Sequence, residues 1–385
     1  MKRPGIAAVT AVAALGALAL AACGSSSSGG TNAAAKKCAT TIGMEGPLTG
    51  PVASLGQEQL HFAQLAVAMD NAANKTHITL DQGDTQLEPS QAITVTQQFT
   101  SNSAIVGVVG PAGSQEVEAV GPLMARAQMP FISGSATAVA LTTGKYPTFF
   151  RVVSKDSVQG PQDANYIVQN LHPKALMIVD DEEAYSTGLV AAMLPVFKAA
   201  GIKVDHESVS QKVTDFSSLV AKITAAETVV VLPWQIAGNA QQLGRDMQQE
   251  HKKAAIFGTD GLFSPGANGF EISGSYVSSF GPDITYISAD AAIAAAAHKK
   301  YGSFGTFGPP VFAATHVMDE AIASVCKSGH TPTRALVLAA VKKTNEPASI
   351  LGQPISFTSH GDLVNGKFFL FKINSKGAYT LIPSS

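Results

Sequence analysis

Short apolar runs of β-favouring residues alternate along the chain with stretches that have a helical period. The strands predicted from this pattern cover residues 40–44, 78–81, 104–109, 130–133, 149–153, 175–179, 204–208, 228–232 and 254–257. Between them, apolar residues spaced i, i+3, i+4 and i+7 predict amphipathic helices, as at Phe62, Leu65, Ala66 and Met69. So many strand–helix–strand repeats predict an α/β fold of doubly wound parallel sheets with helices on both faces.

The alternation changes at two places. After the β-like run 149–153, the stretch "SKDSVQGP" leads to a new helix at about Gln159, which suggests a crossing between two lobes. Near the C-terminus, "ISFT" and "GKFFLFKINSKGAYTLIP" predict short strands with a turn at Ser375–Gly377.

Loops of small residues follow three predicted strands. "VVGPAGSQEV" leads to Ser114 at an expected helix start, "PFISGSATAV" carries Ser135 and Thr137, and "IFGTDGL" carries Asp260. In open parallel sheets ligands bind beyond the carboxyl ends of the strands, and free N–H groups at helix N-termini attract anions. The first two loops therefore predict either a carboxylate site or two helix caps without a ligand. Asp260 is either a partner for a cation or part of an Asp-Gly turn.

The first 37 residues have the composition of an export signal and a tether. Lys2 and Arg3 precede an apolar run and the ending "LAAC", which is typical of a lipoprotein signal peptide over residues 1–22, with lipid attached at Cys23. Ordinary signal cleavage is the alternative. The small polar tract 23–37 is predicted to be a flexible tether to the outer face of the cell membrane.

Composition limits the partners of the remaining chain. The charged fraction is 14%, the formal net charge is −2, and the basic residues are scattered, so nucleic acid is not an expected partner. Only Cys38 and Cys326 follow Cys23, without a CxxC or Cys/His cluster, which argues against a metal site. The chain also lacks GxSxG, GxGxxG, GxxxxGK[ST] and HExxH, so no enzyme activity and no cofactor are predicted.

Several motifs, taken in order, give the chain a family resemblance from about Thr40 to Pro383. These include "GPLTGPVASLGQE", "DTQLEPSQA", "VVGPAGS", "FISGSATA", "FFRVVSKDSVQGP", "IFGTDG" and "GDLVNGKFFLFKI". The chain resembles the type I solute-binding proteins of ABC importers, the leucine/isoleucine/valine-binding kind. That resemblance implies a monomer of two lobes joined by three crossings, which closes on a small amino acid and delivers it to an ABC permease.

The resemblance also implies roles for individual residues. Ser114, Ser135 and Thr137 match positions that hold the ligand's carboxylate and ammonium from one lobe. Asp260 and Tyr185 match the ammonium partner and a cleft tyrosine from the other lobe. Trp234 falls near a further aromatic contact, unless a one-residue shift puts Gln235 there.

Two departures suggest an altered side-chain pocket: Leu55 where relatives often have an aromatic residue, and Phe312 where a tyrosine is expected. A non-amino-acid carboxylate or amide therefore stays open as the ligand. A ligand sensor of the same fold, signalling to a membrane kinase, is the alternative to a transport protein.

The expected lobes are residues 38–155 with 280–350 and residues 156–279 with 351–385. Within this arrangement Cys38 precedes the first strand, at the edge far from the cleft. Cys326 ends a helix that begins near Phe312, beside the cleft, and so runs to the same edge. A Cys38–Cys326 disulfide is therefore predicted.

Overall fold

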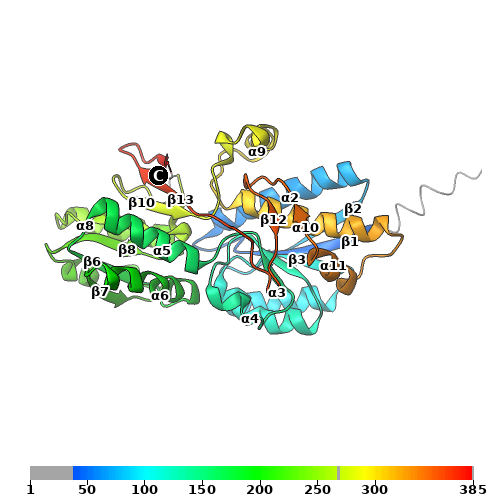
Figure 1. Ribbon diagram of the computed structural model, residues 1–385, viewed down its shortest axis with the longest axis horizontal. Coiled ribbons are helices and arrows are strands. Elements are labelled where there is room, and N and C mark those ends of the chain that lie inside the picture. Colours follow the sequence, from blue (N-terminus) through cyan, green and yellow to red (C-terminus); the bar gives the residue numbers. More distant parts are fainter. Residues whose placement is uncertain (1–37, 267–268, 384–385) are drawn as a thin grey trace, which may run out of the picture.

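The computed structural model describes residues 38–266 and 269–383 and shows two α/β lobes side by side (Figure 1). The predicted signal peptide, the tether and Cys23 lie outside the described residues. The mostly parallel sheets confirm the predicted fold class. Within the described part of the chain, no helix is long and apolar enough to cross a membrane.

The first lobe is built on a five-stranded parallel sheet with the order β2-β1-β3-β4-β5. Its strands are β1 (Ala39–Gly46), β2 (His77–Asp84), β3 (Ile105–Val109), β4 (Phe131–Ser133) and β5 (Phe149–Arg151). The connecting helices are α2 (Ala53–Asn74), α3 (Pro89–Ser101), α4 (Ser114–Arg126) and the 3-10 turn η1 (Val139–Thr142).

A later stretch of the chain returns to the first lobe. It comprises η4 (Ile284–Tyr286), η5 (Ser288–Asp290), α9 (Ala291–Tyr301), α10 (Gly308–Lys327), α11 (Arg334–Val341) and the small antiparallel pair β11 (Asn345–Glu346) and β12 (Ile355–Ser356). Helix α10 packs along α2, and almost its whole length is buried.

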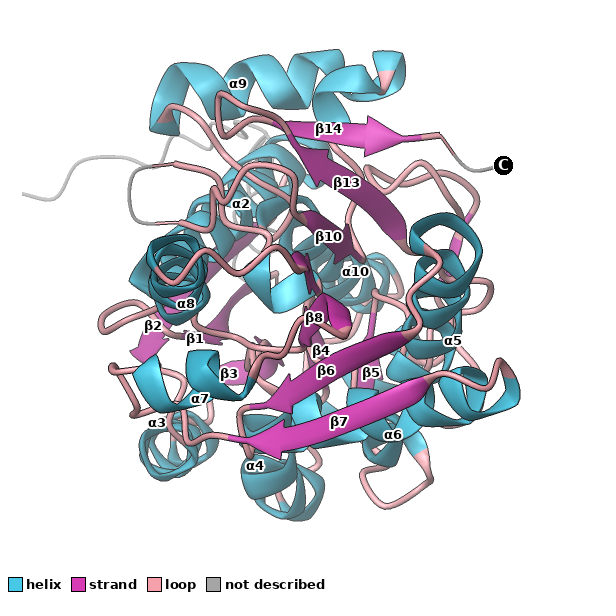
Figure 2. Cartoon of the chain, turned by 90° about the vertical axis from the view of Figure 1, so that its left-hand side faces the viewer, coloured by secondary structure: helices cyan, strands magenta, loops and turns pink. Residues whose placement is uncertain are grey.

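The second lobe contains a seven-stranded sheet with the order β14-β13-β10-β9-β8-β6-β7. Its strands are β6 (Ala175–Asp180), β7 (Lys203–Ser208), β8 (Glu227–Leu232), β9 (Ala255–Gly258), β10 (Tyr276–Ser279), β13 (Phe369–Ile373) and β14 (Tyr379–Ile382). The helices are α5 (Asp156–Tyr166), the π-helical η2 (Ile167–Leu171), α6 (Ala184–Ala199), α7 (Ser217–Lys222), α8 (Ala237–Gln249) and the 3-10 turn η3 (Asp260–Leu262). Figure 2 shows α5 and α6 on one side of this sheet and α7 and α8 on the other.

Each of the nine predicted strands is present, but three details differ from the prediction. Strand β10 was not predicted. Helix α5 begins at Asp156, three residues before the expected Gln159. Met69, expected on the buried face of α2, is 40% exposed, although Phe62, Leu65 and Ala66 are buried as expected.

The chain passes between the sheets three times: after β5, after β10 and before β13. Leu351, Ile355 and Leu363 pack into the core of the first lobe, so residues 351–363 do not belong to the second lobe as expected. The third crossing lies between Leu363 and Phe368, which packs into the second lobe's core. The first lobe extends past the expected boundary at residue 350 because apolar residues of β12 and of the segment after it pack into its core.

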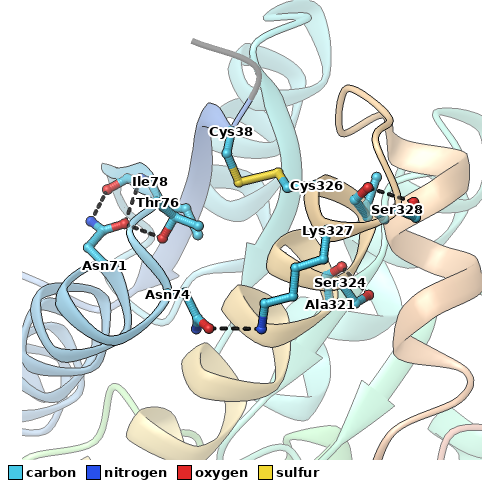
Figure 3. The surroundings of a disulfide bond; sticks show 11 residues. Cys38, Asn71, Asn74, Thr76, Ile78, Ala321, Ser324, Cys326, Lys327 and Ser328 are labelled. Carbon is cyan, nitrogen blue, oxygen red and sulfur yellow. Dashed lines mark hydrogen bonds between the residues drawn. A yellow bond between two sulfur atoms is a disulfide. The ribbon is translucent and has the colours of Figure 1, made fainter. Parts of the chain in front are cut away.

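A disulfide closes the end of the first lobe far from the second. Cys38 and Cys326 are bonded, with 5.6 Å between their Cα atoms, inside the range that a disulfide requires (Figure 3). The bond joins the residue before β1 to the last turn of α10. The same view shows Lys327 Nζ donating to Asn74 Oδ1 at the end of α2.

Candidate functional site

Two loops at the carboxyl ends of β3 and β4 form one wall of the cleft. Val109 of β3 lies opposite Ile132 of β4, so the loops that follow these strands are neighbours. Ser135 Oγ donates to the Ala112 carbonyl (2.9 Å). Ser114 Oγ, at the start of α4, accepts from the N–H of Ala138 (3.1 Å). The hydroxyls of Ser114 and Ser135 therefore hold the two loops to each other.

Small residues are required in this wall because the backbone segments are close. A Cβ at Gly110, whose φ is +102°, would lie 2.1 Å from the Glu45 carbonyl oxygen. A Cβ at Gly134 would lie 2.9 Å from the N atom of Val311, at the start of α10. Side chains at these two positions would push the loops away from β1 and from the start of α10.

The opposite wall comes from the second lobe. Leu232 of β8 pairs with Gly258 of β9, so the loops that follow these strands are also neighbours. Asp260 Oδ1 accepts from Gln159 Nε2 (2.6 Å) and from the Tyr185 hydroxyl (2.8 Å). The same hydroxyl lies 2.5 Å from Thr259 Oγ1. Asp260 and Tyr185 are 3% exposed, so this wall presents a carboxylate that is almost removed from water.

Two further carboxyl groups lie behind Asp260. Burial raises the pKa of Asp260 to about 6, although hydrogen bonds from Tyr185 and Gln159 lower it. Burial and, to a smaller extent, the charge of Asp260 raise the pKa of Asp156 to about 7. Burial, with a contribution from Asp260, holds the pKa of Asp163 well above its usual range. This wall therefore has a surplus of acidic groups, which favours a cationic group in the cleft.

The two walls meet across a small cavity. It has a volume of about 30 Å³ and is lined by Leu55, Leu87, Ala112, Ser114, Ser135, Tyr185, Gln235, Asp260, Gly261 and Phe307. A larger cavity of about 540 Å³ shares Leu55, Gln235, Gly261 and Phe307 with it and continues past Phe263, Tyr301 and Phe304. The polar end of the cleft is thus narrow, and an apolar, partly aromatic space adjoins it.

Five of the residues selected from the sequence line the small cavity: Leu55, Ser114, Ser135, Tyr185 and Asp260. Thr137 is fully buried in the loop after β4, two residues beyond Ser135, and its hydroxyl contacts the Asp156 carboxyl and lowers the pKa of that group. It does not line the cavity.

Trp234 and Phe312 do not line either of these cavities. The indole of Trp234 packs against Phe216 and donates to the Val179 carbonyl (2.8 Å), so the tryptophan belongs to the second lobe's core. Its neighbour Gln235 lines both cavities, as the one-residue alternative predicts. Phe312 is buried in the first lobe's core on α10, and Phe307, just before that helix, lines the cleft instead.

One pair of side chains bridges the lobes beside the small cavity. Gln115 of α4 donates to Gln235 of the second lobe, with 2.9 Å between Nε2 and Oε1. Gln235 is held in turn by Gln211, and its N–H donates to Asp181 Oδ2. The second lobe thus presents an amide that is already oriented toward α4.

A fully buried arginine connects the cleft wall to the crossings. Arg151 Nη1 donates to the carbonyls of Ala136 and Ala138 (3.2 and 2.9 Å), on either side of Thr137. Its Nε and Nη2 both donate to Asp362 Oδ1 (2.8 and 2.6 Å), which precedes the third crossing. Lys155, on the first crossing, contacts the other oxygen of Asp362. One ion-pair network therefore connects the loop after β4 to two of the three crossings.

Sequence reasoning missed Gln159, which donates to Asp260, and the neighbouring acidic groups Asp156 and Asp163. Because the helix was expected to begin at Gln159, Asp156 was read as part of a linker. The spacing of Asp156, Gln159 and Asp163 at i, i+3 and i+7 is nevertheless a helical face, and this polar face could have been found from the sequence.

Comparisons with known proteins agree with this architecture. A family model described as "periplasmic binding protein" matches residues 39–378. A Leu/Ile/Val-binding protein of Rhizobium johnstonii is 28% identical over 338 residues, covering 86% of this chain and 91% of the relative. An amino acid binding protein of Pseudomonas aeruginosa is 27% identical over 352 residues, covering 89% and 92%.

Solved structures show the same fold. The isoleucine complex of the branched-chain amino acid transporter substrate-binding protein LivJ from Streptococcus pneumoniae has a TM-score of 0.79 at 24% identity, covering 89% of this chain and 99% of that one. A solute-binding protein of R. palustris in complex with benzoate has a TM-score of 0.79 at 18% identity, covering 89% and 95%. With the family model matched over nearly all of the described residues, the chain belongs to the periplasmic binding protein family, whose members bind solutes and are not enzymes.

Proposed function

We propose that the protein is an exported, lipid-anchored substrate-binding protein of an ABC importer that captures an α-amino acid with an apolar side chain. The observation that carries this proposal is the pairing of two walls across one small cavity. A wall of hydroxyls and backbone groups faces a buried carboxylate, Asp260. A zwitterion presents one charge to each wall, and buried charges are tolerated only when they are paired and hydrogen-bonded.

In this proposal the carboxylate of the amino acid is held by the first lobe. Helix α4 begins at Ser114, so its N-terminus faces this site. The N-terminus is the positive end of the helix dipole and favours an anion. The Ser114 and Ser135 hydroxyls already fix the loops, so backbone N–H groups supply most of the contacts and the hydroxyls add to them. The ammonium then faces Asp260 and Tyr185 from the second lobe.

The apolar side chain extends toward the larger cavity. Leu55, Phe263, Phe304 and Phe307 give this space an apolar and aromatic lining. Leu55 stands where relatives often have an aromatic residue. The aromatic lining here comes from Phe263, Phe304 and Phe307. The names of relatives that bind leucine, isoleucine and valine support an aliphatic side chain as the first candidate.

Transport follows from closure of the two lobes. A ligand that contacts both walls favours the closed state over the open state, and only such differential contacts shift the equilibrium. The closed form is then the one that a membrane permease recognises. The lipid anchor at Cys23 keeps the protein near that permease, and the functional unit is a monomer.

A carboxylate or amide solute without an ammonium is the second candidate. The specific observation in its favour is the pKa of Asp260, which burial raises to about 6, so a protonated carboxyl is accessible and can donate to an oxygen atom. The benzoate complex of the R. palustris protein supports this candidate for the fold in general.

The test is mass spectrometry of the solute that co-purifies with the protein. Native spectra give the mass of the complex, and denaturation releases the solute for identification. An aliphatic amino acid is the expected result, and calorimetry with the identified compound then gives its affinity. A sugar, a phosphate ester or a simple aromatic acid would overturn the proposed ligand class.

The anchor and the choice between transport and sensing need separate tests. Substitution of Cys23→Ser is expected to release the protein from membranes into the medium or periplasm. Membrane retention of this variant would contradict lipidation at Cys23. Uptake of the labelled ligand is expected to fall when the protein is deleted, whereas intact uptake would favour the sensor.

A further inference from the structure

A cluster of acidic groups around one histidine lies in the first lobe, where α10 packs on α2. His316 Nδ1 is 2.9 Å from Asp70 Oδ1 and 3.0 Å from Asp70 Oδ2. Glu320 follows His316 by one helical turn. One ligand atom from each of Asp70, His316 and Glu320 lies within 4.8 Å of the others. None of these residues lines the cleft cavities.

A third carboxyl group, Asp319, completes the cluster. His316, Asp319 and Glu320 are spaced i, i+3 and i+4 on α10, so they share one helical face. Asp319 is fully buried, no donor among the described residues satisfies its oxygens, and its carboxyl lies against that of Asp70. Two buried carboxyl groups in contact cannot both be ionised at low cost unless a cation lies with them.

The cluster has more acceptors than donors. Asp70, Asp319 and Glu320 carry up to three negative charges around a single imidazole. The other donor in contact is Asn74 Nδ2, which lies 2.5 Å from Glu320 Oε1. The nearby Lys327 donates to Asn74 Oδ1 and not to a carboxylate of the cluster (Figure 3). An unpaired buried carboxyl is costly, and a cation is the group that would satisfy it.

A second histidine–aspartate pair in this protein serves as a comparison. His206 Nε2 is 2.7 Å from Asp180 Oδ2. There the carboxylate is also satisfied by neutral donors, the Ser208 hydroxyl (2.7 Å) and the N–H of Glu182 (2.9 Å). The Asp70–His316 pair instead adjoins two further carboxyl groups, so it has the composition of a metal site.

We propose that Asp70, His316, Asp319 and Glu320 bind one divalent ion of the first transition series, with zinc as the best match. Zinc takes imidazole and carboxylate ligands at about 2.0–2.1 Å, which puts two tetrahedral ligand atoms about 3.3 Å apart. The separations of 2.9 and 3.0 Å between His316 and Asp70 need only a small adjustment. An imidazole among the ligands disfavours calcium and magnesium, which take oxygen ligands.

Access to this site is from solvent. The side chain of His316 is 34% exposed and that of Asp70 is 9% exposed, whereas Asp319 is at the bottom of the cluster. The ion would cross-link α2 to α10, in the same lobe as the Cys38–Cys326 disulfide. Because ligands lose protons when a metal binds, uptake is accompanied by proton release.

The experiment measures metal uptake by protein purified without a histidine tag and treated with a chelator. About one equivalent of Zn²⁺ or Co²⁺ is expected per chain, with visible absorption bands for bound Co²⁺ and release of protons. His316→Ala is expected to weaken binding at least tenfold. Glu320→Gln, a milder change at a half-buried position, should also weaken it.

His206→Ala is the matched control and should bind the ion as the parent does. Circular dichroism and binding of the amino acid ligand verify that each variant is folded, and the ligand's affinity should not depend on the metal. If the parent takes up no stoichiometric ion, Asp70 and Asp319 share a proton and the proposal is wrong. Equal binding by the parent and His316→Ala would also overturn it, whatever the cleft binds.

Discussion

At the scale of single residues, Asp260 has the most distinct role of the cleft side chains. It is the carboxylate that lines the small cavity, and Gln159 and Tyr185 both donate to its Oδ1. An ammonium in the cavity would be its natural counter-charge. The hydroxyl of Ser114, in contrast, already accepts a hydrogen bond from Ala138 within the first-lobe wall of the cleft.

This difference predicts an order of losses in affinity. Asp260→Ala should weaken binding of the amino acid by about 2–5 kcal/mol, because the ammonium loses its charged acceptor. Asp260→Asn should cost less, and Ser114→Ala should cost about 1 kcal/mol because one neutral hydrogen bond is lost. Calorimetric titration of the three variants gives the order. If Asp260→Ala bound as tightly as the parent, Asp260 would be a turn residue only.

The raised pKa of Asp260 also predicts a pH dependence. Only the ionised carboxyl attracts an ammonium, and in the ligand-free protein burial raises this pKa to about 6. The affinity should therefore fall as the pH drops from about 7.5 through 6, by up to about tenfold per unit below the pKa. The Asp260→Asn variant should show a flatter profile over this range. A parent affinity that stays constant down to pH 5 would be inconsistent with an ammonium at Asp260.

Residue positions were the least predictable feature from the sequence. The strand before Trp234 was predicted, but the exit of the chain from that strand decides whether residue 234 or residue 235 faces the cleft. The packing of Trp234 on Phe216 settles this in favour of Gln235, and such packing depends on a segment 18 residues earlier. Asp156 was missed because its helix begins earlier than the sequence pattern indicated, and Asp163 because its contact with Ser278 of β10 is not local.

At the scale of elements, the central parallel strands β3, β6 and β8 were predictable because each has a continuous apolar run. Strand β10 was missed because Tyr276–Ser279 has two serines and follows a Gly-Ser-rich stretch. Its pairing with β9 on one side and β13 on the other makes it a strand, and that pairing is not local. The segment 351–363 was assigned to the wrong lobe for the same reason.

The Cys38–Cys326 disulfide belongs to this scale because it joins β1 to α10 across 288 residues of sequence. Replacing both cysteines by alanine should reduce the free energy of unfolding by about 2–5 kcal/mol, mainly through the greater entropy of the unfolded chain. Ligand affinity should stay the same, since neither cysteine lines the cleft. Denaturant unfolding and calorimetry measure the two quantities. Unchanged stability would mean that the bond contributes nothing to the fold.

The Arg151–Asp362 pair couples elements that are far apart in sequence. Burial alone would raise the pKa of Asp362, but Arg151 and Lys155 outweigh it and hold the pKa below its usual range. Asp362→Asn would leave the fully buried Arg151 without its charged partner, at a cost of about 3–5 kcal/mol in the free energy of unfolding. Ligand affinity should also fall, because Arg151 holds the carbonyls of Ala136 and Ala138.

Asp205→Asn is the control for this prediction. It removes an exposed ion pair with Lys203 and should leave the melting temperature almost unchanged. If Asp362→Asn behaved like Asp205→Asn in both stability and ligand affinity, the Arg151–Asp362 network would not connect the loop after β4 to the crossings.

At the scale of the whole molecule, two lobes of similar construction lie side by side (Figure 1), and residues of both lobes line the small cavity between them. The alternation of strands and helices predicted both lobes, since each sheet is mostly parallel. The sequence pattern alone could not show which walls face each other. That arrangement comes from the three crossings and from contacts such as Gln115 with Gln235.

The central claim is that the cleft recognises both charges of an amino acid. Calorimetric titration of ligand-free protein with the amino acid, its N-acetyl derivative and its methyl ester tests this most directly. The free amino acid is expected to bind tightly and each derivative to bind much more weakly, because each derivative lacks one of the two charges. If the N-acetyl derivative bound as tightly as the free amino acid, recognition of both charges would be wrong, since Asp260 would then have no ammonium to pair with.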